Sequence, residues 1–162
     1  MTTAPRSGIG YDVHSLVQGR PLVLGGVNIP FERGLAGHSD GDVLLHAIID
    51  ALLGAASLGD IGAHFPSSDP RYKDISSVLL LEDTLRLLGK HSWHIVHVDA
   101  TIVAEQPRMQ PFTEGMRVNI AQSLNLDKAC VNVKAKTTDG LGFAGRGEGI
   151  ASYAIATLES TA

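Results

Sequence analysis

Two sets of polar side chains interrupt apolar stretches of this sequence and have types and spacings suited to chemistry. In "GIGYDVHSL" (residues 8–16), Asp12 and His14 stand two positions apart in a strand-like run, so their side chains face the same side. In "DVLLHAIID" (42–50), Asp42, His46 and Asp50 follow at four-residue spacing along one face of a helix. Charged groups on an otherwise apolar helix are costly to bury unless they are paired or bind a metal.

Asp12, His14 and His46 together form a donor set for a metal ion. One carboxylate and two imidazoles suit a four-coordinate Zn²⁺ that keeps one position open for water or a substrate. Asp50 or Asp42 would then orient His46 from behind. An internal network of hydrogen bonds would satisfy the same side chains without a metal, and the spacing favours neither interpretation.

The turn "KTTDG" (136–140) offers a second place for chemistry. Its two hydroxyls, its carboxylate and its permissive glycine suit phosphate oxygens or a Mg²⁺ bound to phosphates. An ordinary Asx-turn also explains the Asp-Gly pair. The nearby "GLGFAG" (140–145) has the spacing of a dinucleotide fingerprint, but a strand pattern follows it instead of a helix, which excludes that function.

The composition predicts one globular domain over residues 1–162. Hydrophobic residues make up 44% and charged residues 19% of the chain. A formal net charge of −4 argues against a nucleic-acid partner. The single cysteine, Cys130, cannot form an internal disulfide, and residues 1–8 lack the apolar core of a secretion signal. With no stretch apolar enough to span a bilayer, we expect a cytoplasmic protein without a membrane partner.

The apolar patterns predict an α+β fold with strands in one layer and three helices in the other. Strands are expected around residues 8–16, 20–30 (two strands around a Gly-Gly turn), 94–104, 131–136 and 150–158. Helices are expected at about 42–56, capped by Asp40 or Asp42, at 77–90, and from Pro111 onward. Residues 57–74 are expected to form a long loop, and loops of this length without secondary structure are usually functional lids or disordered segments. Residues 137–149 are expected to form a Gly-rich loop.

Six segments resemble the 2-C-methyl-D-erythritol 2,4-cyclodiphosphate synthase family. They are "YDVH" (11–14), "GGVNIP" (25–30), "HSDGDVLLHAIIDALLGAASLGDIG" (38–62), "FPSSDP" (65–70), "VNVKAKTTDGLGF" (131–143) and "GRGEGIA" (145–151). The resemblance implies a mixed or antiparallel sheet with helices on one face. It also implies a homotrimer whose strands surround a central axis, with each active site between adjacent subunits.

The resemblance implies a phosphorus–oxygen lyase of the non-mevalonate isoprenoid pathway. The 2-phosphate of 4-diphosphocytidyl-2-C-methyl-D-erythritol 2-phosphate attacks the β-phosphorus of its own diphosphate, CMP leaves, and a cyclic diphosphate remains. Asp12, His14 and His46 would bind one Zn²⁺ per active site. Asp139 would bind a second divalent cation, Mg²⁺ or Mn²⁺, while His38 and Thr137 would stabilise the transition state.

Substrate contacts carry over from the resemblance in the same way. The pocket for the methylerythritol phosphate would comprise Ser39, Asp60, Ile61, Gly62, Phe65, Pro66, Ser67, Ser68 and Asp69. The cytidine pocket would comprise Ala104, Glu105, Gln106, Pro107, Arg108, Met109, Gln110, Ala135, Lys136 and Thr138. Phe143 and Arg146 would line a cavity on the trimer axis that can hold an isoprenoid diphosphate, with Glu148 available to balance the three arginines.

Two other functions fit part of the same pattern. A zinc-dependent hydrolase on this scaffold would release free phosphate instead of a cyclic diphosphate. A trimeric binding protein that senses isoprenoid diphosphates would keep its ligand affinity after loss of Asp139. Against both, the chain has the full set of family positions: Asp12, His14, His38, His46, Thr137 and Asp139.

Overall fold

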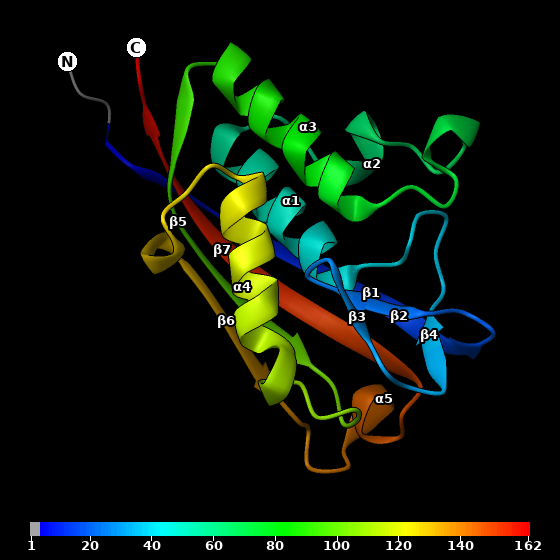
Figure 1. Ribbon diagram of the computed structural model, residues 1–162. Coiled ribbons are helices and arrows are strands. Elements are labelled where there is room, and N and C mark those ends of the chain that lie inside the picture. The colour runs from blue at the N-terminus through cyan, green and yellow to red at the C-terminus, as the bar shows by residue number, and fades with distance from the viewer. Residues whose placement is uncertain (1–3) are drawn as a thin grey trace.

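The computed structural model describes residues 4–162 and shows one sheet with its main helices gathered on one face (Figure 1). The five strands lie in the order β4-β1-β7-β5-β6, and only β5 and β6 run parallel. The strands are β1 (Arg6–Gln18), β4 (Arg33–Leu35), β5 (Trp93–Val103), β6 (Val131–Lys136) and β7 (Gly149–Ser160). A separate hairpin pairs β2 (Leu22–Leu24) with β3 (Val27–Ile29). The α+β prediction and the mixed sheet are confirmed; residues 1–3 of the expected domain lie outside the described residues.

The three predicted helices are present as α1 (Val43–Ala56), α3 (Ser77–Lys90) and α4 (Thr113–Ser123). Pro111 lies in a short 3₁₀ helix, η2 (Gln110–Phe112), directly before α4. The predicted loop at 57–74 is wrong in detail, because it contains α2 (Ile61–His64) and the 3₁₀ helix η1 (Pro70–Tyr72). Asp60 and Asp69 cap these two turns by accepting backbone N–H groups. Likewise α5 (Gly142–Gly145) lies within the Gly-rich loop, and η3 (Lys128–Cys130) precedes β6.

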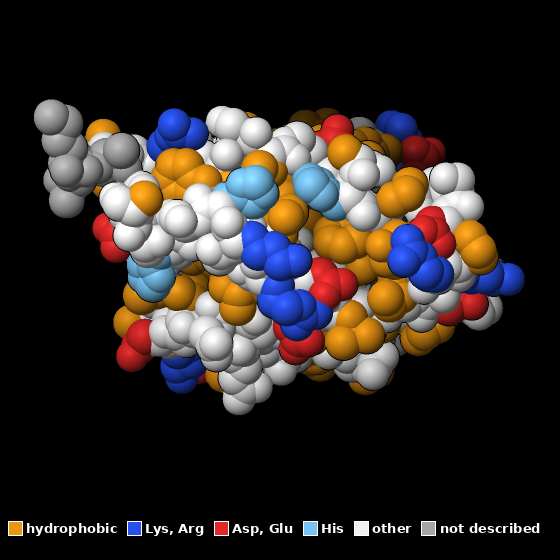
Figure 2. Space-filling view, turned by 90° about the horizontal axis from the view of Figure 1, so that it is seen from above, with side chains coloured by type: hydrophobic (Ala, Val, Ile, Leu, Met, Phe, Trp, Pro, Cys, Tyr) orange, Lys and Arg blue, Asp and Glu red, His pale blue; other side chains and the backbone are white. Residues whose placement is uncertain are grey.

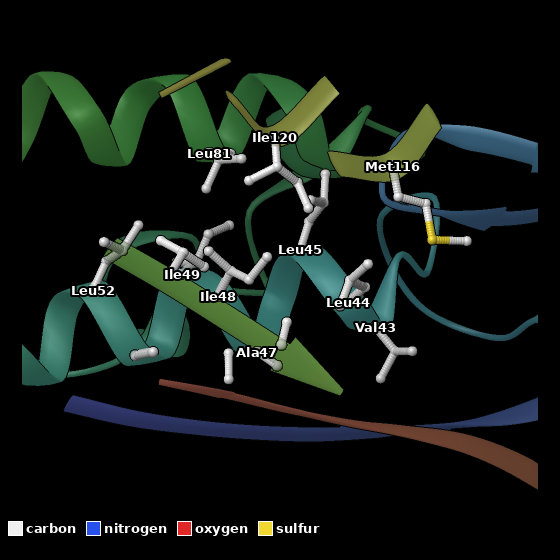
Figure 3. Packing of buried hydrophobic residues seen from close by; sticks show 14 of the residues in the cluster. Val43, Leu44, Leu45, Ala47, Ile48, Ile49, Leu52, Leu81, Met116 and Ile120 are labelled. Carbon is white, nitrogen blue, oxygen red and sulfur yellow. The ribbon is translucent and has the colours of Figure 1, made fainter. Parts of the chain in front are cut away.

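Helix α1 forms the centre of the hydrophobic core. Figure 3 shows it between the strands on one side and α3 and α4 on the other, with Leu81, Met116 and Ile120 approaching from those two helices. Nearly every residue of α1 is buried, including Ile48 and Leu52 at 0% exposure. Full burial of each such side chain contributes about 1.5–3 kcal/mol, so the core holds α1 firmly against the sheet.

Two glycines of β1 let α1 pack directly on the strand. A Cβ atom at Gly10 would collide with the backbone of Ala47, and one at Gly8 with the backbone of Ala51 and Ala55. The absence of side chains at these positions allows a close approach of helix and strand. This approach places the first turns of α1 beside the segment of β1 that carries Asp12 and His14.

On strands β1 and β7, the opposite face of the sheet is apolar and exposed. Side chains next to the two glycines on β1, and their neighbours on β7, point away from α1 because strand side chains alternate. They are Ile9 (70% exposed), Tyr11, Val13, Tyr153 and Ile155. A contiguous apolar sheet face of this kind is typical of an interaction surface.

The charged side chains are mixed on the face that Figure 2 shows. Lys and Arg side chains there alternate with Asp and Glu, so that face carries no extended basic surface for nucleic acid. In the part of the chain that the structure describes, no helix is long and apolar enough to cross a membrane.

Candidate active site

Asp12, His14 and His46 meet at the junction of β1 and α1. The Asp12 Oδ2 atom lies 2.9 Å from His14 Nε2 and 3.0 Å from His46 Nδ1, and the two ring nitrogens are 3.2 Å apart. One ligand atom from each residue lies within 4.8 Å of the others. A carboxylate oxygen and two imidazole nitrogens are the donors that zinc prefers, so this set fits the expected metal.

The cluster is partly shielded from water, and its charges are strongly coupled. Burial raises the pKa of Asp12, but hydrogen bonds from and charges on His14 and His46 outweigh it and hold this pKa well below its usual range. Burial lowers the pKa of His14, yet the bond to Asp12, together with the backbone of Ala36, leaves it raised. Protons and a divalent cation would therefore compete for the same three atoms.

The residues behind His46 differ from the sequence-based expectation. Its Nε2 atom lies 2.9 Å from the Ser77 hydroxyl and 3.1 Å from the Ser39 hydroxyl. The prediction that Asp42 or Asp50 orients His46 is wrong. Asp42 caps α1 and accepts from Gly25 and Gly26 in the β2–β3 turn, and Asp50 has a different partner in α2.

An open cavity of about 230 Å³ adjoins the cluster. Besides the three candidate ligands, the cavity is lined by His38, which was expected to stabilise the transition state. Five residues of the expected substrate pocket also line it: Ser39, Ile61, Gly62, Phe65 and Ser67. Tyr72 and Leu80 also line it, and the sequence analysis missed both. Leu80 is an apolar residue of the predicted helix 77–90, so nothing in the sequence separates it from the core residues of that helix. Tyr72 lies in the expected lid, and no sequence pattern marked it as a cavity residue.

Hydrogen bonds fasten the segment 57–74 over this cavity. Asp50 Oδ1 accepts the backbone N–H of Ile61 at 2.7 Å, which anchors the "DIG" turn to α1. His38 Nε2 donates to the carbonyl of Asp69 at 3.0 Å, and the backbone N–H of Asp74 donates to the carbonyl of His38. Asp60, Pro66, Ser68 and Asp69 are not among the residues that line the cavity. Their expected contacts with substrate stay predictions.

The expected cytidine pocket gathers at another edge of the sheet. Because β5 and β6 are parallel, residues 104–110 and 137–140 emerge at the same end of the two strands. The backbone N–H of Ala104 donates to the carbonyl of Lys136, and Glu105 Oε2 accepts the N–H of Thr138. Every predicted nucleotide-binding residue belongs to these two segments or to the end of β6.

Thr137 and Asp139 lie in this second region and not in the cavity beside Asp12. The Thr137 hydroxyl donates to Asp139 Oδ1 at 3.4 Å, and both residues are exposed. Asp139 has φ +52°, a left-handed conformation that Asp tolerates in turns. Within one chain, therefore, His38 lines the cavity of the metal cluster, whereas Thr137 and Asp139 do not.

Phe143 and Arg146 belong to α5 and its end, near the exposed face of the sheet. Phe143 lines a cavity of about 180 Å³ together with Tyr11 and Tyr153. The Arg146 guanidinium makes two hydrogen bonds of 3.1 Å to the Glu148 carboxylate, so this arginine has an anionic partner within the chain. This pairing holds the pKa of Glu148 below its usual value.

Comparisons with known proteins agree on one group of enzymes. Residues 5–159 match the model of the YgbB family. A relative named 2-C-methyl-D-erythritol 2,4-cyclodiphosphate synthase, from Desulfatibacillum aliphaticivorans, is 60% identical over 95% of this chain and 99% of its own length. The bifunctional IspDF from Campylobacter jejuni superposes with a TM-score of 0.94 at 41% identity, covering 98% of this chain and 44% of that longer one. The CDP complex of IspF from Plasmodium falciparum has a TM-score of 0.85 and 32% identity, with 98% of each chain covered.

Proposed function

The chain belongs to the YgbB family, and we propose that its cavity carries out a metal-assisted intramolecular phosphoryl transfer. The enzyme is a 2-C-methyl-D-erythritol 2,4-cyclodiphosphate synthase of isoprenoid biosynthesis, like its curated relatives. It converts 4-diphosphocytidyl-2-C-methyl-D-erythritol 2-phosphate into the cyclic diphosphate and CMP, as a phosphorus–oxygen lyase. The observation that carries the assignment to this site is the meeting of Asp12, His14 and His46 at an open cavity.

Asp12, His14 and His46 would hold Zn²⁺ through one oxygen and two nitrogens. When bound, the ion supplies a Lewis acid that orients a phosphate oxygen and offsets its charge. His38 and Ser39 line the same cavity. The Ser39 hydroxyl can donate to a phosphate or sugar oxygen, whereas the His38 Nε2–H is used by the Asp69 carbonyl and leaves Nδ1 for a contact with substrate. The hydrogen bond from His38 Nε2 to the backbone carbonyl of Asp69 fixes the orientation of the His38 ring.

The proposed reaction requires no nucleophile from the protein. Attacking and attacked groups belong to one substrate and are both anionic, so charge repulsion and entropy make up most of the barrier. Holding both ends of the substrate in place lowers the entropic part. The anchored turn at Ile61 and Gly62 and the ring of Phe65 offer a fixed wall for that purpose.

Each complete active site is proposed to form between two copies of the chain within a homotrimer. Thr137 and Asp139, with the cytidine segment 104–110, would come from the neighbouring copy and complete the cavity beside Asp12. Two observations support this arrangement: both residues lie outside that cavity in their own chain, and the sheet exposes the apolar face of Ile9, Tyr153 and Ile155. Burying that face around a three-fold axis would remove it from water.

The expected ligands of the second region follow from this arrangement. Segment 104–110 would read cytosine largely through backbone groups, in keeping with the CDP bound by the Plasmodium falciparum neighbour. Asp139 would ligate Mg²⁺ or Mn²⁺ between the substrate phosphates. Phe143 and Arg146 would line the axial cavity, where an isoprenoid diphosphate would have to compete with Glu148 for the arginine. The protein is proposed to work in the cytoplasm.

A product assay tests the function. Purified protein is incubated with the diphosphocytidyl substrate with added Zn²⁺ and Mg²⁺ and after chelation, and products are identified by phosphorus NMR. We expect cyclic diphosphate and CMP, lost on chelation and in His46→Ala, and unchanged in the control His94→Ala, which alters an exposed histidine. Free phosphate as the product would identify a hydrolase. No turnover by a correctly metallated protein would reject the enzyme and favour a binding protein.

Asp139→Ala separates the two proposed metal sites. We expect turnover to be lost while one Zn²⁺ per chain is retained, because Asp139 contributes nothing to the Asp12 cluster. Metal analysis of the purified variant measures this directly. Loss of the tightly bound zinc in Asp139→Ala would contradict the division of roles.

A further inference from the structure

The ring of His46 is held on both sides by polar atoms. Its Nδ1 faces Asp12 and His14, while its Nε2 faces the hydroxyls of Ser77 and Ser39. Ser77, the first residue of α3, is fully buried, and His46 is 7% exposed. Because Ser77 is fully buried and lies outside the cavity lining, the direction of its hydrogen bond with His46 is determined by the protein.

Asp40 determines the direction of those bonds. Its carboxylate accepts the Ser77 hydroxyl at 2.6 Å through Oδ1 and the Ser77 backbone N–H at 3.0 Å through Oδ2. It also accepts the backbone N–H of Asp42 at 3.1 Å. A carboxylate surrounded by three donors acts only as an acceptor. The hydroxyl proton of Ser77 therefore points at Asp40, and the lone pairs of that oxygen remain for His46.

This direction selects one form of the imidazole. With its own proton committed to Asp40, Ser77 can only accept from His46, so this shorter contact requires a ring proton on Nε2; Ser39 Oγ, 3.1 Å from the same nitrogen, can accept that proton as well. In the opposite tautomer a lone pair on Nε2 would face the lone pairs of Ser77 at 2.9 Å, which is repulsive. A neutral ring protonated on Nε2 turns the Nδ1 lone pair toward Asp12 Oδ2, 3.0 Å away, and toward His14 Nε2, 3.2 Å away, so this form is stable only with a cation between these atoms.

We propose that Asp40 and Ser77 form a positioning pair that fixes the tautomer and rotation of His46 for metal binding. The inference rests on the proposed zinc site and adds two residues that touch neither the metal nor the substrate. It also links the metal centre to the start of α3, because Ser77 belongs to that helix and Asp40 to the loop before α1. Carboxylates and hydroxyls behind a histidine ligand raise its basicity and fix its orientation.

Zinc affinity of the full-length protein tests the pair. Metal is removed from the wild type, Ser77→Ala and Ser76→Ala, and Zn²⁺ binding is measured by competition with a chromophoric chelator. We expect Ser77→Ala to bind zinc about 10–100-fold more weakly. Ser76→Ala is the matched control, since Ser76 is the adjacent, exposed residue and its side chain makes no capping bond. Zinc affinity of Ser77→Ala within about twofold of the control would overturn the proposal.

A double-mutant cycle distinguishes positioning from a general loss of structure. If Asp40 acts through Ser77, Asp40→Asn weakens zinc binding in the wild type but adds no further loss in Ser77→Ala. Equal losses of zinc affinity in both backgrounds would contradict the relay. Circular dichroism of each variant verifies that the chain is folded under the titration conditions.

The tautomer is measured without any metal. Nitrogen-15 NMR of the histidine side chains in the chelated protein reports which ring nitrogen of His46 carries the proton. Because Nδ1 can donate to Asp12 when no metal is bound, Nε2 is the informative atom, and we expect it to carry a proton in the wild type and to lose it in Ser77→Ala. A wild-type ring protonated on Nδ1 alone would overturn the inference even if zinc binds. A wild type that binds no zinc but shows the Nε2–H form would reject the proposed metal site and leave the positioning pair supported.

Discussion

Replacing Asp42 with alanine tests how α1 is held in place. The buried carboxylate accepts the N–H of Leu45, which caps the helix, and the N–H groups of Gly25 and Gly26 in the β2–β3 turn. Asp42 is 0% exposed, so water cannot replace its oxygens. Each hydrogen bond to a charged group contributes about 1.5–3 kcal/mol. Removing a buried carboxylate regains part of its desolvation cost, so we expect a net loss of about 3–5 kcal/mol in the free energy of unfolding.

Urea unfolding followed by circular dichroism measures this loss at pH 7, with chelator present and protein concentration fixed. Asp127→Ala is the control, because Asp127 caps η3 from an exposed position through one N–H group. That change is expected to cost about 1 kcal/mol or less. If Asp42→Ala is no more destabilising than Asp127→Ala, the role given to the buried cap is wrong.

The difference in stability between the wild type and Asp42→Ala is expected to depend on pH. Burial raises the pKa of Asp42 from its ordinary value of 3.8 to about 6. The folded protein therefore keeps a proton that the unfolded chain releases, and the stability contributed by Asp42 is lost as pH rises from 4 through 6. The change amounts to up to about 3 kcal/mol. The difference in stability between wild type and Asp42→Ala should be larger at pH 4 than at pH 7; the reverse order would contradict the assignment.

Two further changes test the packing and the assembly. Gly10→Ala should lower the free energy of unfolding by about 1–3 kcal/mol, because the new Cβ meets the backbone of Ala47. Gly89→Ala, in open space on α3, should be neutral or stabilising when both variants are measured by urea unfolding. Tyr153→Lys places a charge on the exposed apolar face of the sheet and should shift the protein from trimer to monomer in analytical ultracentrifugation. A monomeric wild type, or a trimer unaffected by Tyr153→Lys, would remove the support for the proposed assembly.

Local patterns were sufficient for the strand and helix layers and for naming the three residues of the metal cluster. Alternation of apolar residues predicted β5 and β6, and two-residue spacing placed Asp12 and His14 on one face of β1. Helical spacing identified His46 as polar on a buried helix, which completed a set of three metal donors. The family resemblance then favoured a metal over an internal network of hydrogen bonds. These features depend on short-range periodicity, which a sequence displays directly.

The partners of the α1 stripe could not be predicted in the same way. Asp42, His46 and Asp50 share a face of the helix, but each meets a different segment: the β2–β3 turn, the β1 cluster and the start of α2. The hydroxyl behind His46 comes from Ser77, 31 residues further along the chain. Spacing within a helix carries no information about which distant segment packs against it, so the supporting contacts required the tertiary structure.

Zinc reconstitution tests the central claim, that Asp12, His14 and His46 hold a metal required for turnover. Chelated protein receives Zn²⁺ in steps at saturating Mg²⁺, and formation of CMP is measured at each step. We expect turnover to rise in proportion to the added zinc and to level off at one ion per chain, and we expect His46→Ala to stay inactive throughout. Full turnover by the zinc-free wild type, or an unchanged titration in His46→Ala, would contradict it.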